Sequence, residues 1–351
     1  MAPAPRRLDR MMSEEPSRPE ALTEIVQRYR GHAGLLAKSP LRLVDEVLGP
    51  TDWITGPGDD AAALPGEGGG FLLAAGEAIW PPLVDADPYA AGIAAVVANV
   101  NDMAAMGGWV LGIVDTMVGP EPLVRRALEG MQAASKLYGV PILGGHLTVR
   151  DGPVSVSAFA IGRARVLLPA VNAAPGQALL LAVALEGHLR GGLQIFSSVS
   201  ERADRLAGDV AVLPTVAESG LCLAAKDVSM AGLLGTLAML LEPSGVGVTV
   251  ELDRVPKPEN VPLPDWLGAF PSFGFLLCAP PERAEACAAP FHDRGLACEI
   301  IGTIDATGEL RVRLGNREAT LARPAVEGVT GLGRAGQSGK APSSADEASG
   351  V

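Results

Sequence analysis

The sequence has few aromatic residues, cysteines and histidines, which stabilise many small disulfide-rich or zinc-binding proteins. Aromatic residues make up only 4% of the chain, and four cysteines and four histidines are spread over 351 residues. The cysteines form no CxxC pair, and a chain of this length needs no disulfide staples, so we interpret them as reduced, buried thiols. Widely spaced histidines also argue against a structural zinc site.

Three motifs of well-known enzyme classes are missing as well. The chain has no GxxxxGK[ST] run, which excludes a Walker-type nucleoside triphosphatase. No GxGxxG segment follows a predicted strand, as a Rossmann dinucleotide site requires. The GxSxG elbow of many serine hydrolases is also absent.

Positive charge is scarce, and long uninterrupted apolar runs are missing. The formal net charge of -12 argues against a nucleic-acid-binding surface, which needs clustered Lys and Arg. Residues 91–113 are apolar, but Asp102 and the Gly107-Gly108 pair interrupt them, so we expect no membrane span. The N-terminus lacks the apolar core of a signal peptide. We therefore expect a cytoplasmic protein that binds neither nucleic acid nor membrane.

The chain has the length and composition of a well-packed two-domain protein of the α+β class. We expect a disordered leader at 1–20, an N-terminal domain at 21–168, a C-terminal domain at 169–324 and a disordered tail at 325–351. Short helices are expected within 21–48, and longer helices after Asp87 and over 122–139, 230–241 and 282–289. Strands are expected at 71–75, 110–117, 140–143, 154–161, 178–184, 246–252, 272–279, 297–304 and 309–314.

The predicted helix after Asp87 carries the most informative segment. Asp87 is a good N-cap and Pro88 a good first helical residue. An apolar stripe begins at Ile93, and at about 100° per residue Asp102 falls nearly opposite it. Asp102 therefore faces either water or a site, and Asn101 beside it adds an amide to a helix of small residues.

Other carboxylates precede this helix. Gly58-Asp59-Asp60 places adjacent carboxylates on a glycine-flanked loop, where they are either Mg²⁺ ligands or simply turn residues. Glu77 lies at the end of a predicted strand, where it either binds a metal ion or is solvated at the surface.

Two later segments also offer groups to a substrate. Gly144-Gly145 follows a predicted strand and would allow a phosphate to approach the backbone, while His146 is either an acid–base or metal-binding group or a hydrogen-bonded structural residue. Asp227 and Ser229 precede a predicted helix, where Ser229 either caps the helix or contacts a phosphate.

These segments occur in the order seen in the AIR synthase superfamily, which the chain resembles over roughly residues 45–320. The closest spacing is similar to that of thiamine-monophosphate kinase. The matching segments are Gly58-Asp59-Asp60-Ala61-Ala62, Asn101-Asp102-Met103-Ala104-Ala105-Met106-Gly107, Leu143-Gly144-Gly145, Ile161-Gly162-Arg163-Ala164 and Asp227-Val228-Ser229.

The resemblance implies a homodimer with a barrel shared between N-terminal domains, and a cleft for ATP and Mg²⁺. It makes four carboxylates candidate metal ligands: Asp60, Glu77, Asp102 and Asp227. It implies that Arg163 contacts ATP, that Ser229 contacts a phosphate or the nucleotide, and that Asp102 is central to catalysis. The activity it implies is phosphoryl transfer from ATP to an amide, carbamoyl or phosphate oxygen of a small metabolite, with His146 moving a proton.

The chain departs from the kinase pattern at several of these positions. His146 stands where the kinase has Asp, Met230 follows Ser229 where the kinase has another Asp, and Glu77 replaces an Asp. Fewer carboxylates imply fewer metal ions. A second hypothesis is therefore a nucleotide-binding or scaffolding homodimer without turnover.

Overall fold

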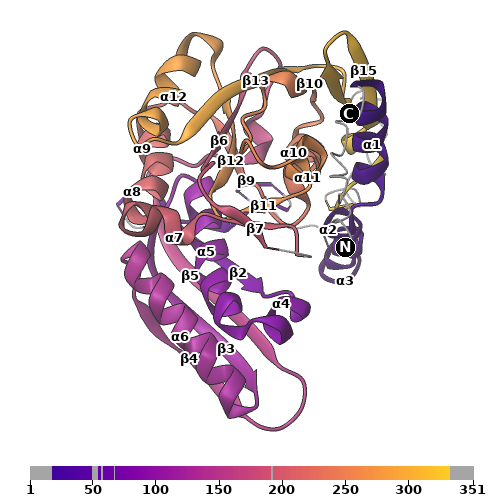
Figure 1. Ribbon diagram of the computed structural model, residues 1–351. Helices are drawn as coiled ribbons and strands as arrows, with labels where there is room; N and C mark the ends of the chain where they lie inside the picture. The colour runs from indigo at the N-terminus through magenta and orange to yellow at the C-terminus, as the bar shows by residue number, and fades with distance from the viewer. Residues whose placement is uncertain (1–17, 50–53, 57, 67, 191–192, 333–351) are drawn as a thin grey trace, which may run out of the picture.

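The computed structural model describes residues 18–49, 54–56, 58–66, 68–190 and 193–332, which form two lobes built around separate sheets (Figure 1). The N-terminal lobe, residues 58–164, holds a five-stranded sheet, and the C-terminal lobe, residues 178–332, holds a seven-stranded sheet and a small three-stranded one. This is the two-domain α+β architecture that the sequence predicts.

The sheet of the N-terminal lobe has the strand order β1-β2-β5-β3-β4, with β3 and β4 parallel and the other pairs antiparallel. Helices α5 and α6 pack together on one face, where Leu73, Met103 and Met131 are buried in a common core. The elements of this lobe are β1 (Ala62–Pro65), β2 (Phe71–Ala78), α4 (Pro81–Ala86), α5 (Pro88–Ala105), β3 (Trp109–Gly119), α6 (Glu121–Tyr138), β4 (Ile142–Val149) and β5 (Ser155–Ala164).

The helix α5 begins and ends where the sequence predicts. The Asp87 carboxylate accepts a hydrogen bond from the backbone N–H of Ala90 at 3.0 Å, and Pro88 is the first helical residue. Gly107 has φ +74° just after the helix, and a Cβ there would lie 2.7 Å from the Val166 carbonyl oxygen. The end of α5, and with it Asp102, is therefore fixed by local backbone chemistry.

Two details of this lobe differ from expectation. Gly144-Gly145-His146 lies inside β4 rather than after a strand, because parallel pairing with β3 continues past a register shift at Ile113/Val114. Asp151-Gly152, an Asp-Gly pair of the kind typical of a hairpin turn, does not join two paired strands. It connects β4 to β5, which lie on opposite sides of β3.

Both faces of the large C-terminal sheet are covered. Its strand order is β15-β14-β10-β13-β6-β12-β9, with α10 on one face and α9 and α12 on the other. The elements of this lobe are β6 (Ala178–Val183), β7 (His188–Arg190), β8 (Ile195–Ser197), α7 (Val199–Arg202), α8 (Leu206–Val210), α9 (Val212–Glu218), β9 (Ala224–Asp227), α10 (Gly232–Ser244), β10 (Gly247–Glu251), α11 (Leu263–Leu267), β11 (Phe270–Pro271), β12 (Gly274–Ala279), α12 (Ala284–His292), β13 (Ala297–Asp305), β14 (Leu310–Leu314), β15 (Arg317–Ala322) and α13 (Pro324–Glu327).

The first helices, α1 (Arg18–Arg30), α2 (Ala33–Leu36) and α3 (Arg42–Leu48), were expected within the N-terminal domain. In the structure α1 lies beside β15 and α11, and Leu22 and Ile25 are buried in the C-terminal core (Figure 1). The expected boundary of the tail also moves, because α13 follows residue 323 and the Glu242 carboxylate accepts backbone N–H groups through Gly331. Residues 1–17 and 333–351 lie outside the described part.

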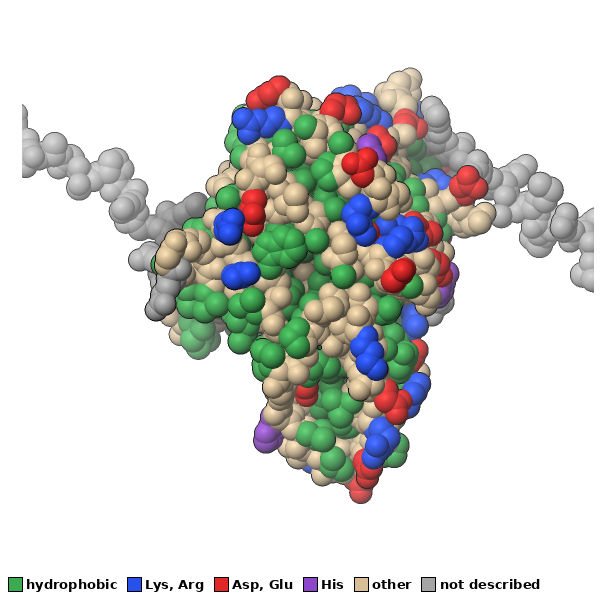
Figure 2. Space-filling view, turned by 90° about the vertical axis from the view of Figure 1, so that its left-hand side faces the viewer, with side chains coloured by type: hydrophobic (Ala, Val, Ile, Leu, Met, Phe, Trp, Pro, Cys, Tyr) green, Lys and Arg blue, Asp and Glu red, His purple; other side chains and the backbone are tan. Residues whose placement is uncertain are grey.

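The second face of the N-terminal sheet is open and apolar. Its exposed hydrophobic side chains form what we call the open face: Leu64, Leu72, Trp109, Leu111, Leu143, Phe159 and Ile161. Figure 2 shows the molecule from the side, with hydrophobic side chains on the lower lobe and charged ones along one border. Over the described residues, no helix is both long enough and apolar enough to span a membrane.

Candidate active site

Three carboxylates from distant parts of the chain meet between the lobes. Asp60 follows a loop of the N-terminal lobe, Asp102 lies in the last turns of α5, and Asp227 ends β9 of the C-terminal lobe. Each offers an oxygen atom, and these atoms all lie within 4.8 Å of one another. We call Asp60, Asp102 and Asp227 the acid cluster.

The loop that carries Asp60 is held in place by its neighbour Asp59. The Asp59 carboxylate accepts the backbone N–H of Ala170 and the backbone N–H of Asp60, each at 3.0 Å. Because Ala170 belongs to the segment between the lobes, Asp59 connects the loop to that segment. Of the two adjacent carboxylates, Asp59 thus positions the loop and Asp60 joins the cluster.

A buried lysine that the sequence analysis did not single out contacts this loop. The Lys226 ammonium donates to the Asp60 carboxylate and lies 4.0 Å from that of Asp59, and all three side chains are almost fully buried. The other Asp60 oxygen accepts the backbone N–H of Asp227 at 3.3 Å. The sequence did contain a signal for this contact. Lys226 interrupts the apolar run that precedes Asp227, and a buried lysine needs an acidic partner.

The negative charges of the acid cluster are only partly compensated by positive charge. Burial, followed by repulsion from Asp227, Asp60 and Glu77, raises the pKa of Asp102 well above its ordinary value. Burial and Asp60 likewise raise the pKa of Asp227, and burial raises that of Asp59 to about 7 although Lys226 opposes it. Hard oxygen ligands with uncompensated negative charge are the donor set that Mg²⁺ prefers.

Glu77 and Lys38 extend the site into an adjoining cavity. Glu77 shares the helix-covered face of β2 with buried Leu73 and Ala75, and it lines a cavity together with Lys38, Asp102, Asp227 and Ser229. Burial raises the pKa of Glu77, and the charge of Lys38 lowers it in part. Three of the four predicted metal ligands, Glu77, Asp102 and Asp227, thus line one cavity.

The N-terminal segment reaches this cavity because it packs closely on the C-terminal lobe. At Gly34 in α2, a Cβ atom would lie only 2.1 Å from the Met230 carbonyl oxygen, so only glycine allows this approach. The contact places the turn after α2, with Lys38, at the cavity. Beyond it lies a wider hollow of about 810 Å³, also lined by Lys38, Trp80, Arg190 and Gln194.

Ser229 does not cap the following helix. The N-cap of α10 is Ala231, without a side-chain hydrogen bond, and the Ser229 backbone N–H donates to the Thr236 hydroxyl at 3.1 Å. The Ser229 side chain instead belongs to the lining of the cavity beside Asp227. The capping role is therefore wrong, and contact with a phosphate or nucleotide stays a prediction.

Several predicted site residues lie apart from the acid cluster within this chain. Asn101 is fully buried, and its amide donates to the Ser272 carbonyl at 3.1 Å, so it joins the lobes instead of facing the cavity. His146 is exposed on β4 and contacts the Thr148 hydroxyl, with Gly144 and Gly145 preceding it. Arg163 lines a hollow on the open face, opposite the sheet face that carries Glu77.

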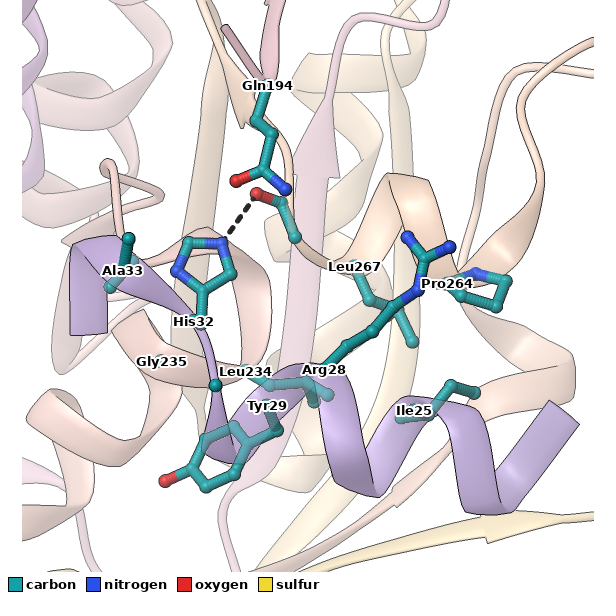
Figure 3. A pocket seen from close by; sticks show the side chains of 13 residues that line it. Ile25, Arg28, Tyr29, His32, Ala33, Gln194, Leu234, Gly235, Pro264 and Leu267 are labelled. Atoms are coloured by element: carbon teal, nitrogen blue, oxygen red, sulfur yellow. Dashed lines mark hydrogen bonds between the residues drawn. The ribbon is translucent and has the colours of Figure 1, made fainter. Parts of the chain in front are cut away.

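A separate cavity of about 340 Å³ lies between α1, α10 and α11. Figure 3 shows Ile25, Arg28 and Tyr29 of α1 along its wall, with His32 at one side. The Nε2–H group of His32 donates a hydrogen bond of 3.0 Å to the Gly268 carbonyl oxygen. This histidine therefore helps to fasten the N-terminal segment to the C-terminal lobe.

Comparison with known proteins identifies the family. The model of the AIR synthase related protein N-terminal domain matches residues 58–164, and that of the C-terminal domain matches residues 175–315. The chain belongs to the AIR synthase superfamily.

Among curated relatives, an uncharacterized protein of Synechocystis is 35% identical over 303 residues, which cover 84% of this chain and 94% of that protein. The phosphoribosylformylglycinamidine synthase subunit PurL of Methanopyrus kandleri is 26% identical, covering 93% of this chain and 46% of its own length. The selenide, water dikinase of Myxococcus xanthus is 28% identical over a region that covers 66% of this chain and 70% of that protein.

Solved structures share the fold. T. maritima PurL complexed with ADP superposes with a TM-score of 0.71 at 18% identity, covering 90% of this chain and 52% of PurL. AaThiL complexed with AMPPCP and TMP gives a TM-score of 0.61 at 18% identity, covering 79% of this chain and 94% of AaThiL. The chain thus spans about half of the PurL chain and nearly all of AaThiL.

Proposed function

We propose that this chain is an enzyme that uses ATP and Mg²⁺ to phosphorylate an oxygen atom of a small metabolite. The observation that carries the proposal is the meeting of carboxylate oxygens of Asp60, Asp102 and Asp227 within 4.8 Å of one another, beside a cavity that Asp102 and Asp227 line. Relatives named as PurL and as a selenide, water dikinase, and a structural neighbour complexed with ADP, support a nucleotide in this cavity.

The residues of the cluster fit a magnesium ion. Asp60, Asp102 and Asp227 would hold it, with Glu77 close by, because carboxylate oxygens are the ligands that Mg²⁺ prefers. Bound Mg²⁺ supplies positive charge that offsets the charge on the phosphates. The raised pKa values of Asp102 and Asp227 support this assignment, since both carboxylates lack such charge in the protein alone.

Other residues of the chain bind the phosphates and the acceptor. Lys38 and Ser229 line the cavity beside Asp227, where an ammonium and a hydroxyl suit phosphate oxygens. The acceptor occupies the wider hollow next to Trp80 and Arg190. Its oxygen bonds to the γ-phosphorus while the bond to the bridging oxygen breaks, and ADP leaves.

The open face supports a homodimer. A monomer rarely leaves so many large apolar side chains of one sheet in water, and a second copy of the face would cover them. His146, Arg163 and Gly144 lie on or beside this face, so a dimer would bring them to the interface. Their roles toward ATP or the acceptor then depend on the second copy.

The decisive test measures ADP release with Mg-ATP over a panel of small metabolites that carry amide, carbamoyl or phosphate oxygens. We expect Asp102→Asn to abolish ADP release and to keep the fold. Asp115→Asn is a matched control, because Asp115 is also a buried aspartate of the same lobe but lies outside the acid cluster. Magnesium-dependent ATP binding without ADP release for any acceptor would instead indicate a nucleotide-binding homodimer.

A further inference from the structure

The buried ammonium of Lys226 takes up part of the acid cluster's capacity for cations. It contacts the Asp60 carboxylate and lies 4.0 Å from that of Asp59, and its side chain is 5% exposed. The second Asp60 oxygen accepts the backbone N–H of Asp227. Both oxygens of Asp60 are therefore engaged before any metal ion binds.

Asp102 and Asp227 are in a different situation. Within the part of the chain that the structure describes, no Lys or Arg nitrogen lies within 4.0 Å of either carboxylate. Their oxygens nevertheless lie within 4.8 Å of each other and of Asp60. Asp60 of the acid cluster thus shares the Lys226 ammonium with its neighbour Asp59, whereas Asp102 and Asp227 have no such cation beside them among the described residues.

We propose that Lys226 is a resident cation that replaces one divalent ion and limits this centre to a single Mg²⁺ per chain, held chiefly by Asp102 and Asp227. The inference rests on the proposed function and specifies its metal content. An ammonium is a compact point charge, and burial between two carboxylates keeps it in place without exchange with solvent. A second divalent ion would have to displace it from Asp60.

The first test counts bound Mn²⁺, used as a paramagnetic probe for Mg²⁺, on the full chain by electron paramagnetic resonance of the free ion. We expect one Mn²⁺ per wild-type chain, one for Lys226→Arg and two for Lys226→Met, whose Asp59–Asp60 pair is free to bind a metal ion. Two ions on the wild-type chain, or one on a folded Lys226→Met variant, overturn the proposal. If Lys226→Met does not fold even with Mn²⁺, the wild-type and Lys226→Arg counts decide it.

A second test separates a resident cation from an ordinary buried ion pair. Lys226→Met should melt several degrees below the wild type in EDTA and recover most of that loss in Mn²⁺. Arg202→Met is the control, because Arg202 is a buried cation paired with Asp209 and Glu186 away from the cluster. Its loss should persist in Mn²⁺. Equal recovery of both variants, or recovery of neither, overturns the role of Lys226.

The metal count also distinguishes this inference from the proposed function. Failure to release ADP with every acceptor overturns phosphoryl transfer, while a count of one Mn²⁺ per chain still supports the resident cation. Two Mn²⁺ ions on an active wild-type enzyme overturn the role of Lys226 and leave phosphoryl transfer intact.

Discussion

The side-chain amide of Asn101 donates a 3.1 Å hydrogen bond to the backbone carbonyl of Ser272 and so joins the two lobes directly beside the acid cluster. Asn101 precedes Asp102 on α5, and Ser272 lies between β11 and β12. The Ser272 hydroxyl in turn accepts the backbone N–H of Ser198 at 2.9 Å. One buried amide thus fixes the carboxylate of the N-terminal lobe against the lobe that supplies Asp227.

We expect Asn101→Ala to destabilise the protein by about 1–3 kcal/mol, because the Ser272 carbonyl would be left buried without this donor. Urea denaturation measures the loss, with Asn172→Ala as a control, since Asn172 also donates to a backbone carbonyl but is exposed. The control should lose much less. A variant of unchanged stability that no longer binds ATP would show that Asn101 contacts the nucleotide after all.

The parts of the site that could be predicted from the sequence are those with strong local chemistry. The cap at Asp87 and the glycine after α5 determine where that helix begins and ends, and its apolar stripe excludes Asp102 from the core. The resemblance to the AIR synthase superfamily then implied that Asp60 and Asp227 lie near Asp102, and the structure brings the three together.

Other features depend on tertiary contacts that no short sequence pattern predicts. Gly144-Gly145 has the composition of a loop, but pairing with β3 holds it in a strand and turns His146 to the open face. No local sequence pattern in residues 18–48 predicts which lobe these helices pack against. The structure shows it, because Leu22 and Ile25 are buried in the core of the C-terminal lobe. The burial of Lys226 is likewise visible only once Asp59 and Asp60 lie beside it.

The stability of the metal-free protein should change with pH through Asp102. Burial and the neighbouring carboxylates raise its pKa in the folded state, so above the unfolded pKa the carboxyl group loses its proton more readily on unfolding, and stability falls as the pH rises from the unfolded value toward the folded one. Asp102→Asn removes this penalty. In EDTA we expect its melting temperature to exceed that of the wild type at pH 8, with the difference shrinking as the pH falls toward about 4.

Magnesium should reverse this order. The ion stabilises the wild type through Asp102, whereas the asparagine variant offers only a neutral oxygen. Melting curves with and without Mg²⁺ at pH 8 test both statements together. A variant that is less stable than the wild type in EDTA at pH 8 would show that burial and repulsion do not destabilise the charged Asp102 carboxylate.

Lys38 should contribute to ATP binding more than to folding. Its ammonium lines the cavity beside Glu77 and Asp227, and its charge lowers the pKa of both carboxylates in part. We expect Lys38→Met to weaken ATP binding about tenfold, which corresponds to about 1.4 kcal/mol. Calorimetric titration with a non-hydrolysable ATP analogue and Mg²⁺ measures the change. Lys136→Met, at an exposed position on α6, should bind as the wild type does, and equal affinities of all three proteins would remove Lys38 from the site.

The open face should hold two copies of the chain together. Phe159 is 45% exposed near the middle of that face, between β2 and β3. We expect Phe159→Asp to convert a dimer to a monomer, because pairing two copies would bury two carboxylates in an apolar interface. Light scattering after size-exclusion chromatography measures the mass. Val326→Asp is the matched control, because Val326 is 72% exposed on α13 of the other lobe, and it should leave the dimer intact. A monomeric wild type, or a Phe159→Asp variant of wild-type mass, would show that the face does not mediate dimerisation.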